Sequence, residues 1–380
     1  MKHYGVDGKS LEWFSSYLKD RQQYVDYNGQ KSDLLPITTG VPQGSVLGPL
    51  LFLIYVNDLP SSTNKLKLVL FADDSNILIN FKDKTEVTKT LNEELEKIND
   101  WFKANGLKLN ASKTICIMFS KNDDFDETKD LSIRLDGTEL KFTNATTFLG
   151  LIIDEHMSWD EQAKKVANKI SKTHSMINRL KNKLPVTSLK TLYDSLLLPQ
   201  LLYGIVVWGG SGSSQIKRIK QIQKKLIRTI SKSWYRSHTE PRMKELQILN
   251  FDDLYYQQCS LLVHDIVYGE APKNLRRIFK FHRQETGYNL RQSTVDEKKL
   301  EVKQYKTKQA KHSFFMKAPI CYNKIPEDVK LVAVEPEDRK FLKKEIKREC
   351  LKKYQEGITC SNPFCKDKSH HSAIQSSSLG

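Results

Sequence analysis

A chain of 380 residues, with 39% hydrophobic and 28% charged residues, is long enough for two or three domains with buried cores. No apolar run approaches the roughly 18 residues of a membrane-spanning helix, and the N-terminus lacks the apolar centre of a signal peptide. Six cysteines in a chain this long do not form a disulfide framework. We therefore expect an intracellular protein of the nucleus or cytoplasm, neither secreted nor bound to a membrane.

The charge is unevenly distributed along the chain. The net charge is +16, but residues 1–155 contain 18 lysines and arginines against 23 acids. Residues 156–250 contain 18 against 5, and residues 271–380 contain 25 against 13. An acidic first part before a basic remainder suggests carboxylate chemistry next to a surface that binds a polyanion. Lysines on solvated helix faces would give the same composition, so charge alone leaves both interpretations open.

The first 81 residues predict short elements joined by turns. Leu11, Phe14 and Leu18 have helical spacing, and Asn28-Gly29 is a strong hairpin signal between two extended runs. The stretch VPQGSVLGPLLFLIYVNDL begins as a loop with glycine and proline and continues as an apolar helix, which ends near residues 57–58. Residues 66–81 predict a β-hairpin.

The rest of the chain changes from mixed structure to basic helices. Residues 85–105 predict an amphipathic helix closed by Gly106, with Val87, Leu91, Leu95, Ile98 and Phe102 on one face. Ile115, Ile117 and Phe119 alternate as in a strand, and LKFTNATTFLGLIID predicts an extended pair. Basic helices are expected at 159–182 and 185–203, and after the GGSGSS segment at 209–214, which is predicted to be a flexible connection. A Lys-rich helix at 339–354 precedes a polar tail.

The turn of the 66–81 hairpin carries two adjacent carboxylates, Asp73 and Asp74. Two-metal phosphoryl transfer needs carboxylates that are held rigidly, because misplacement by about an ångström costs much of the rate. Leu68, Leu70, Ile77 and Ile79 would anchor one face of this hairpin, and Val69, Phe71 and Leu78 the other. Aspartate is also favoured in ordinary turns, so the pair alone does not establish a metal site.

The order of several motifs decides between these interpretations. PQGSVLGPLLF, FADD, the amphipathic helix, LKLNASKT and FLGLIID follow one another in the chain. This series resembles the later motifs of a reverse transcriptase palm, specifically in non-LTR (LINE-type, Jockey-like) retrotransposons. YGVDGKSLEWFSSYLKDRQQYV resembles the segment before the PQG motif, LPVTSLKTLYDSLLLPQLLYGIVVWG the thumb, and FFMKAPICYNKIPEDVK a trailing segment. A group II intron maturase or a telomerase-like enzyme fits these stretches less well.

The resemblance implies an α+β fold and a polymerase chemistry. A partial palm and fingers, an antiparallel sheet with packed helices, would occupy residues 1–155. A helical thumb would occupy 156–250, and a basic, partly irregular region 251–380. The implied activity is RNA-directed DNA polymerase, with Mg²⁺ or Mn²⁺ as cofactor. The implied partners are an RNA template, a DNA primer and deoxynucleoside triphosphates, and other proteins encoded by the element could join them.

The resemblance also assigns roles to individual residues. Asp73 would be a ligand of the catalytic metals with Asp74 assisting, and Lys113 would protonate the leaving pyrophosphate or offset its charge. The nucleotide and template would lie against Gln43, Gly44 and Ser45, and Arg21 would touch the template. Without the family, these segments equally fit a turn before a helix, a solvated lysine and a surface arginine.

The second half of the implied site binds the primer and the nucleic-acid backbone. Phe148, Leu149 and Gly150 resemble a primer grip, although a buried strand with a glycine kink is the plain alternative. Phosphate contacts of the thumb would come from Lys217, Arg218, Lys220, Lys224, Lys225 and Arg228. Trp208 and Trp234 could stack on bases or simply pack in the core.

One departure from the family pattern limits the activity that we expect of this chain. The strand that carries the first catalytic aspartate in the family would precede YGV, and Asp7, Glu12 and Asp20 do not replace it. We therefore expect an N-terminally truncated polymerase that is inactive alone, or a non-catalytic nucleic-acid-binding remnant. Near the C-terminus, Cys360, Cys365, His370 and His371 suggest zinc, but adjacent histidines are poor geometry for one tetrahedral ion, so zinc is not favoured.

Overall fold

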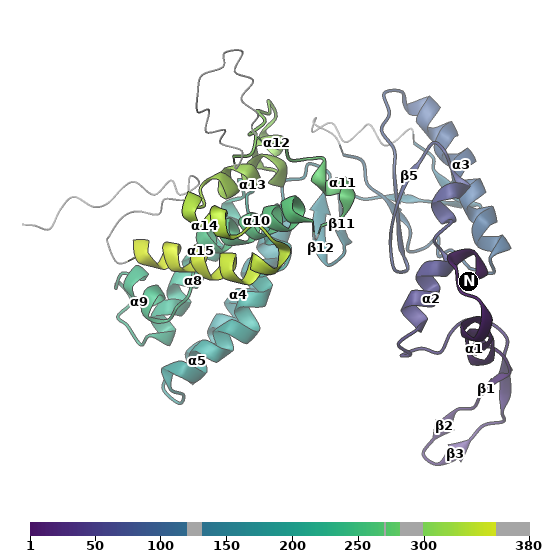
Figure 1. The fold of residues 1–380 in the computed structure, drawn as a ribbon, viewed down its shortest axis with the longest axis horizontal. Helices are drawn as coiled ribbons and strands as arrows, with labels where there is room; N and C mark the ends of the chain where they lie inside the picture. Colours follow the sequence, from purple (N-terminus) through teal and green to yellow (C-terminus); the bar gives the residue numbers. More distant parts are fainter. Residues whose placement is uncertain (120–130, 270, 282–298, 355–380) are drawn as a thin grey trace, which may run out of the picture. The chain divides into compact units, whose positions relative to one another are not determined.

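The computed structural model describes residues 1–119, 131–269, 271–281 and 299–354 (Figure 1). The chain divides into two compact units. Of the described residues, unit 1 contains Met1–Met118 and 131–143, and unit 2 contains Phe119 and those from Asn144 onward. Both helices and strands are present, which confirms the predicted α+β class at this level. The palm and thumb boundaries at 155 and 250 stay predictions.

Unit 1 consists of short strands and three helices longer than one turn. Its helices are η1 (Lys2–Tyr4), α1 (Gly8–Leu18), α2 (Gly48–Tyr55), η2 (Leu59–Ser62) and α3 (Lys84–Ala104). Its strands are β1 (Arg21–Gln23), β2 (Asp26–Tyr27), β3 (Gln30–Lys31), β4 (Leu35–Ile37), β5 (Lys67–Phe71), β6 (Asp74–Leu78), β7 (Ile115–Cys116), β8 (Arg134–Leu135), β9 (Thr138–Glu139) and β10 (Lys141–Phe142). Antiparallel pairs are β1–β4, β2–β3, β5–β6 and β8–β9, and β7 pairs with β10 in parallel.

The predicted turn and helix signals of unit 1 are confirmed. Asn28 and Gly29 both have positive φ, 52° and 81°, and join β2 to β3 as a two-residue hairpin loop. The predicted amphipathic helix is α3, which begins after Asp83, whose side chain accepts a hydrogen bond from the Glu86 amide at 2.7 Å. The predicted alternating strand after residue 114 is wrong in extent: β7 has two residues, and Ile115 and Phe119 are exposed.

The β5–β6 hairpin is anchored on one face only. Leu68, Leu70, Ile77 and Ile79 pack on the cluster of Leu59, Leu66 and Ile98, which comes from η2, the segment before β5 and helix α3. On the opposite face Val69 and Leu78 are exposed, and Phe71 is 59% exposed. The prediction that both faces would be buried is therefore wrong for the second face among the residues that the structure describes.

Unit 2 begins with a β-hairpin and continues as packed helices. The hairpin strands are β11 (Ala145–Phe148) and β12 (Leu151–Asp154). The longer helices are α4 (Asp160–Leu180), α8 (Ser214–Ile230), α10 (Phe251–Tyr268), α13 (Phe314–Asn323) and α15 (Arg339–Lys353). The shorter ones are α5 (Val186–Leu192), η4 (Tyr193–Leu197), α6 (Leu198–Leu202), α7 (Ile205–Trp208), α9 (Glu240–Glu245), α11 (Lys273–Arg276), α12 (Lys308–His312), α14 (Glu327–Val332) and η5 (Pro336–Asp338).

The predicted helix at 185–203 is present as α5, η4 and α6 in succession. The η4 turn is a π-turn, in which the Leu198 amide donates to the Tyr193 carbonyl five residues earlier. Pro199 follows directly, and it has no amide hydrogen to continue the ordinary pattern. A wide turn is the usual response of a helix to such an interruption.

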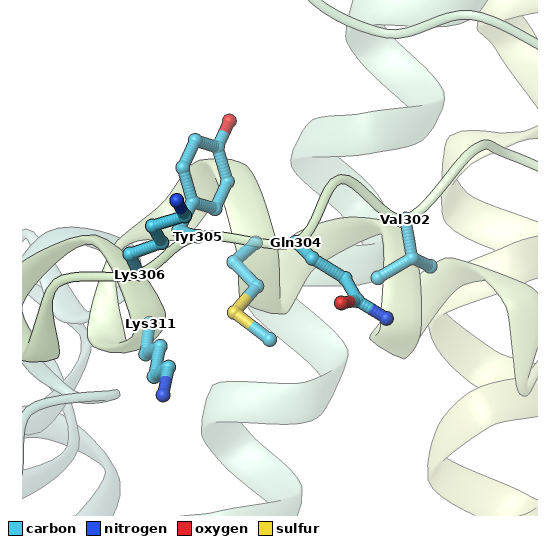
Figure 2. Close-up of a pocket in the computed structure, with 6 residues that line it drawn as sticks. Val302, Gln304, Tyr305, Lys306 and Lys311 are labelled. Atoms are coloured by element: carbon cyan, nitrogen blue, oxygen red, sulfur yellow. The ribbon is translucent and has the colours of Figure 1, made fainter.

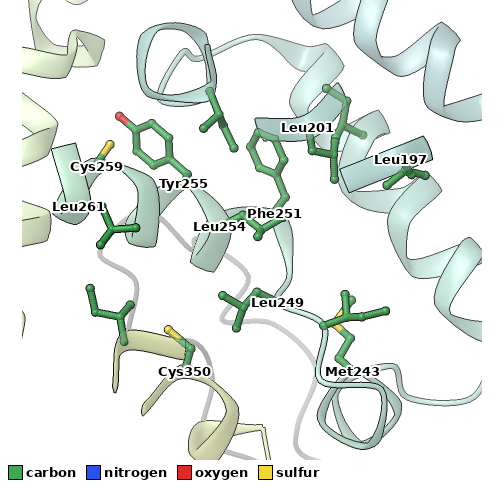
Figure 3. Packing of buried hydrophobic residues seen from close by; sticks show 14 of the residues in the cluster. Leu197, Leu201, Met243, Leu249, Phe251, Leu254, Tyr255, Cys259, Leu261 and Cys350 are labelled. Atoms are coloured by element: carbon green, nitrogen blue, oxygen red, sulfur yellow. The ribbon is translucent and has the colours of Figure 1, made fainter. Parts of the chain in front are cut away.

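One hydrophobic core runs through unit 2. It joins α4, α8, α10, α13 and α15, and includes Ile170, Leu226, Phe251, Cys321 and Ile346. Figure 3 shows Leu201 near Phe251, and Leu197, Leu254 and Cys350 of α15 belong to the same cluster. Helix α4 packs along α8, and α10 contacts both α13 and α15. The region beyond residue 250 is therefore part of the same packed body as the helices before it.

The GGSGSS segment is packed, and the prediction of a flexible connection is wrong. A Cβ atom on Gly209 would lie 2.6 Å from the Ile205 carbonyl oxygen and 2.8 Å from Cδ2 of Tyr255. The Gly210 carbonyl oxygen lies 2.9 Å from Nδ1 of His312. These glycines allow the backbone to approach a buried tyrosine of α10 closely. None of the described helices has the length and apolarity that crossing a bilayer requires.

Candidate metal and nucleic-acid sites

The two carboxylates lie at a tight turn in unit 1. The β5–β6 register places Phe71 opposite Asp74, so Ala72 and Asp73 form a two-residue loop. Ala72 has a φ of 50°, the left-handed conformation that two-residue hairpin loops require at their first position. Residues paired across an antiparallel ladder share a face, so Asp74 lies on the exposed face together with Phe71 and Val69.

Both carboxylates are available for a ligand. Asp73 and Asp74 are exposed, and neither makes a hydrogen bond or ion pair within the part of the chain that the structure describes. Carboxylate oxygens are the ligands that Mg²⁺ and Mn²⁺ prefer, so the turn fits as a pair of donors for such an ion. No group of three or more acidic, histidine or cysteine side chains within the described residues is arranged to hold a metal. The turn thus supplies part of a donor set.

The PQGS segment forms the loop just before α2. The Ser45 hydroxyl accepts a hydrogen bond from the amide of Gly48, the first residue of α2, at 3.0 Å, and Gly48 is buried. The Ser45 side chain therefore ties this loop to the start of the helix. Gln43 and Gly44 are exposed, and Gly44 has a φ of 77° with open space where a Cβ would lie. Of the three predicted nucleotide contacts, Gln43 and Gly44 are the more accessible ones.

Arg21 has a structural role that its sequence context did not suggest. Its Nε donates to the Leu18 carbonyl at 3.2 Å, and its Nη2 donates to the carbonyls of Thr39 (3.4 Å) and Gly40. The guanidinium thus ties the end of α1 to the loop that leads into the PQGS segment. A fixed fork of donors suits this task better than an ammonium group. Lys113 lies in the same unit, exposed in the turn at 111–113.

The predicted primer grip is a hairpin turn in unit 2. Leu149 and Gly150 both have positive φ, 45° and 80°, and join β11 to β12. Three side chains from outside the hairpin hold it. The Tyr203 hydroxyl donates to the Leu149 carbonyl, Lys165 Nζ donates to the Gly150 carbonyl at 3.0 Å, and Gln162 Oε1 accepts from the Ile152 amide at 3.0 Å.

A small hollow lies beside this hairpin, with a volume of about 270 Å³. Its polar lining comes from α4 and α6: Gln162, Lys165, Lys169 and Gln200, together with Tyr203 and Gly150. The sequence analysis did not predict the contacts that Lys165, Tyr203 and Gly204 make with this hairpin. Gly204 has a φ of 62°, and a glycine directly after a predicted helix is the sequence signal of such a helix end.

The six predicted phosphate contacts of α8 divide into two groups. Lys217, Arg218, Lys224 and Lys225 are exposed on the face opposite the buried isoleucines and Leu226. By contrast, Lys220 Nζ pairs with Asp252 Oδ2 at 2.7 Å, and Arg228 Nε donates to the Ser237 carbonyl at 2.8 Å. The first four are therefore available to a polyanion, whereas Lys220 and Arg228 hold neighbouring parts of unit 2.

The positive field of α8 reaches α4. The pKa of His174 is lowered, first by burial of its ring and then by the charges of Lys225 and Lys181. A ring nitrogen of His174 lies 3.2 Å from the Thr229 hydroxyl of α8. Burial is the larger cause of this lowered pKa and the two lysine charges add to it, so the neutral form of the ring is favoured.

The two tryptophans that could stack on bases differ in exposure. Trp208 is fully buried, and its Nε1 donates to the Tyr203 carbonyl at 2.9 Å, so it is a packing residue. Trp234 is exposed. The four nominal zinc ligands, Cys360, Cys365, His370 and His371, lie outside the described residues.

A hollow of about 610 Å³, shown in Figure 2, is lined by Gln304, Tyr305, Lys306 and Lys311 with Val302 and Met316. The sequence analysis did not predict it.

Comparison with known proteins identifies the first part of the chain. Residues 1–153 match the family model described as reverse transcriptase (RNA-dependent DNA polymerase). They belong to the reverse transcriptase family. The match contains the PQGS segment, the Asp73-Asp74 turn, Lys113 and the β11–β12 hairpin, which are the motifs on which the resemblance was based.

The relatives are polymerases of mobile elements from insects. The chain is 27% identical over 248 residues to the RNA-directed DNA polymerase from mobile element jockey of Drosophila melanogaster, covering 63% of this chain and 27% of that protein. It is 30% identical over 244 residues to the probable RNA-directed DNA polymerase from transposon BS of the same species, covering 60% and 25%. The identification as a LINE-type reverse transcriptase is confirmed, and the chain spans about a quarter of the length of these relatives.

Proposed function

We propose that this chain forms part of an RNA-directed DNA polymerase of a non-LTR retrotransposon, with the chemistry in unit 1 and backbone binding in unit 2. The observation that carries the proposal is the turn of Asp73 and Asp74, which offers two exposed carboxylates within the reverse transcriptase match. In the reaction, the 3′-hydroxyl of a DNA primer attacks the α-phosphorus of a deoxynucleoside triphosphate. A new P–O bond forms, pyrophosphate leaves, and an RNA strand is the template.

The side chains of unit 1 would have separate roles in this reaction. Asp73 and Asp74 would donate oxygens to divalent metal ions, which in polymerases activate the attacking hydroxyl and steady the leaving oxygen. Lys113 would offset the charge of the leaving pyrophosphate or transfer a proton to it. Gln43 and Gly44 are exposed and would contact the nucleotide and template, whereas Ser45 and Arg21 would fix the loop that presents them.

Unit 2 would bind the template–primer. The exposed cations Lys217, Arg218, Lys224 and Lys225 would contact phosphates, which gives affinity without sequence preference. The Leu149-Gly150 turn would press on the primer end, and its three external hydrogen bonds support such a fixed position. Changing Lys224 and Lys225 to alanine should weaken binding and its salt dependence. Lys220→Ala is the matched control, because its ammonium is paired with Asp252 and should change stability instead.

The test is primer extension by the purified protein on an RNA template with Mg²⁺ or Mn²⁺. Synthesis that Asp73→Asn abolishes and Asp100→Asn preserves would support the polymerase, since Asp100 is an exposed carboxylate of the same unit on α3. Synthesis that Asp73→Asn leaves intact would reject the assignment of the metal turn. The same assay tests the expectation that the chain alone is inactive.

A second candidate is a protein that binds nucleic acid without chemistry. It is favoured by the observation that the four exposed cations of α8 form a surface within unit 2 alone. Template–primer binding that depends on Lys224 and Lys225, without extension under any metal condition, would select this candidate for the chain by itself, and it is also the result expected of a truncated polymerase. Loss of both binding and extension in the wild-type protein would reject both candidates.

A further inference from the structure

Two adjacent aromatic side chains are exposed in the loop that follows α8. Trp234 is 62% exposed and Tyr235 is 64% exposed. Their ring centroids lie 4.7 Å apart with an angle of 58° between the planes, so the two rings form one continuous apolar surface. Large aromatic side chains are usually buried, and a contiguous exposed pair marks a surface that binds something.

The loop that carries these rings is tied to the end of α8. The Ser233 amide donates to the Arg228 carbonyl at 3.0 Å, and the Arg228 side chain donates to the Ser237 carbonyl at 2.8 Å. The Ser237 amide donates to the Trp234 carbonyl at 3.0 Å, which closes a turn beneath the rings. The rings are therefore presented by a backbone that is hydrogen bonded on both sides of them.

Positive charge surrounds the two rings. The guanidinium carbon of Arg236 lies 5.8 Å from the Trp234 ring centroid and 5.2 Å from that of Tyr235, so both rings hold it by cation–π contacts. Lys232 precedes the rings in the same loop and is exposed. Lys224 and Lys225 are exposed on the preceding turns of α8, and the sequence from 195 to 239 contains no aspartate or glutamate.

This combination identifies the chemistry of the ligand. Aromatic faces next to a cationic backbone track are how proteins bind single-stranded nucleic acid, because every base has a flat face that can stack and every nucleotide has a phosphate. An acidic protein surface would satisfy the cations, but it lacks the regular repeat of one phosphate and one flat base that each nucleotide supplies. Bases in a duplex are already stacked on one another, so a duplex would use the cations and not the rings.

We propose that Trp234 and Tyr235 form a stacking site for unpaired bases, beside the phosphate-binding face of α8. The inference rests on the proposed binding of nucleic acid by unit 2 and is independent of the chemistry at Asp73. A strand bound along α8 would place its phosphates near Lys224 and Lys225 and stack one or two of its bases at the end of the helix.

The test measures binding of the full chain to a fluorescently labelled single-stranded oligonucleotide and to a duplex of the same length. Trp234→Ala and Tyr235→Ala should each weaken single-strand binding by about 5-fold or more, the usual effect of losing one stacked base. Duplex binding should stay within 2-fold. The control is Trp13→Ala, because Trp13 is also exposed (55%) and stacked on Tyr17 but lies in unit 1.

Salt dependence separates stacking from phosphate contacts. Each lost phosphate contact reduces the slope of log affinity against log salt by about 0.7 for a single strand. Trp234→Ala should leave this slope unchanged, whereas Lys225→Ala should reduce it. An abasic oligonucleotide should bind the wild-type protein as weakly as the intact strand binds the Trp234→Ala/Tyr235→Ala double variant, and combining the abasic strand with that double variant should weaken binding little further. Unchanged urea midpoints and far-UV spectra would show that the variants are folded.

Three results would overturn the proposal. Single-strand binding of Trp234→Ala equal to the wild type would reject it, including the case in which the rings serve a protein partner. Equal weakening of single-strand and duplex binding would show a role in phosphate contact or in folding. If the wild-type protein binds neither oligonucleotide, this inference fails together with the proposed function of unit 2, whereas the first two results leave that function intact.

Discussion

Gly204→Ala should destabilise unit 2 by about 2–5 kcal/mol. Gly204 has a φ of 62°, a conformation that costs an alanine about 1–2 kcal/mol. Its Cβ would also lie 2.7 Å from Cδ1 and 3.0 Å from Cδ2 of Leu151, on strand β12. Overpacking of this kind costs about 1–3 kcal/mol more, because the Leu151 side chain, which packs against the core of unit 2, must shift to make room. The change therefore presses directly on the hairpin that carries the Leu149-Gly150 turn.

The assay must report unit 2 by itself, because two compact units can unfold separately. Hydrogen exchange of α4 and α8 peptides in increasing urea provides such a probe. The steric part can be isolated with Leu151→Ala, which removes the atoms in conflict. In that background Gly204→Ala should cost only the backbone part, so the double-mutant cycle should show a coupling of about 1–3 kcal/mol. Additive effects of the two changes would refute the argument that Gly204 is required for its close approach to Leu151.

Three further changes test separate parts of the structure. Arg21→Ala should lower the unfolding free energy of unit 1 by about 1–3 kcal/mol, because three backbone carbonyls lose their donor. Arg21→Lys should recover little of this loss, because one ammonium cannot reach all three carbonyls. A lysine variant that is as stable as the wild type in urea unfolding would contradict this. Ala72→Gly should stabilise the β5–β6 hairpin by up to about 1 kcal/mol, because the φ of 50° at this position is strained for alanine and not for glycine. Faster amide hydrogen exchange in β5 and β6 of the variant would argue against it. Since the pKa of His174 is lowered in the folded state, the unfolded state binds the extra proton more readily, and unit 2 should lose stability as the pH falls below about 6.5. His174→Asn should reduce this loss, and an unchanged pH profile of the urea midpoint would show that another group is responsible.

The sequence predicted the elements whose signals are local. The apolar spacing of α3, α4 and α8 and the Asn28-Gly29 turn each contain their own cause within a few residues. The motif order likewise located the Asp73-Asp74 turn, which no single motif could have done. Such features need no knowledge of distant parts of the chain.

The failures come from contacts between residues far apart in the sequence. GGSGSS has the composition of a linker, and only its approach to Tyr255 shows why glycine is needed at 209 and 210. Arg21 binds backbone carbonyls, which have no signature in a sequence. The cations of α8 look equivalent in the sequence, yet Lys220 forms an ion pair with Asp252 and is not available to a polyanion in the way that the four exposed cations are. Charge patterns thus predicted the basic face, but they could not predict which of its side chains bind other residues of unit 2.

The one-sided burial of the β5–β6 hairpin also bears on how the protein behaves at high concentration. Within the described residues it is a two-stranded sheet, with Val69, Phe71 and Leu78 in contact with water. Sheets with apolar faces and unpaired edges tend to associate with further strands. The apparent molar mass of the purified protein from static light scattering should rise with concentration, and Phe71→Lys should suppress this rise. The hairpin that carries Asp73 and Asp74 is thus also a part of unit 1 that is prone to self-association.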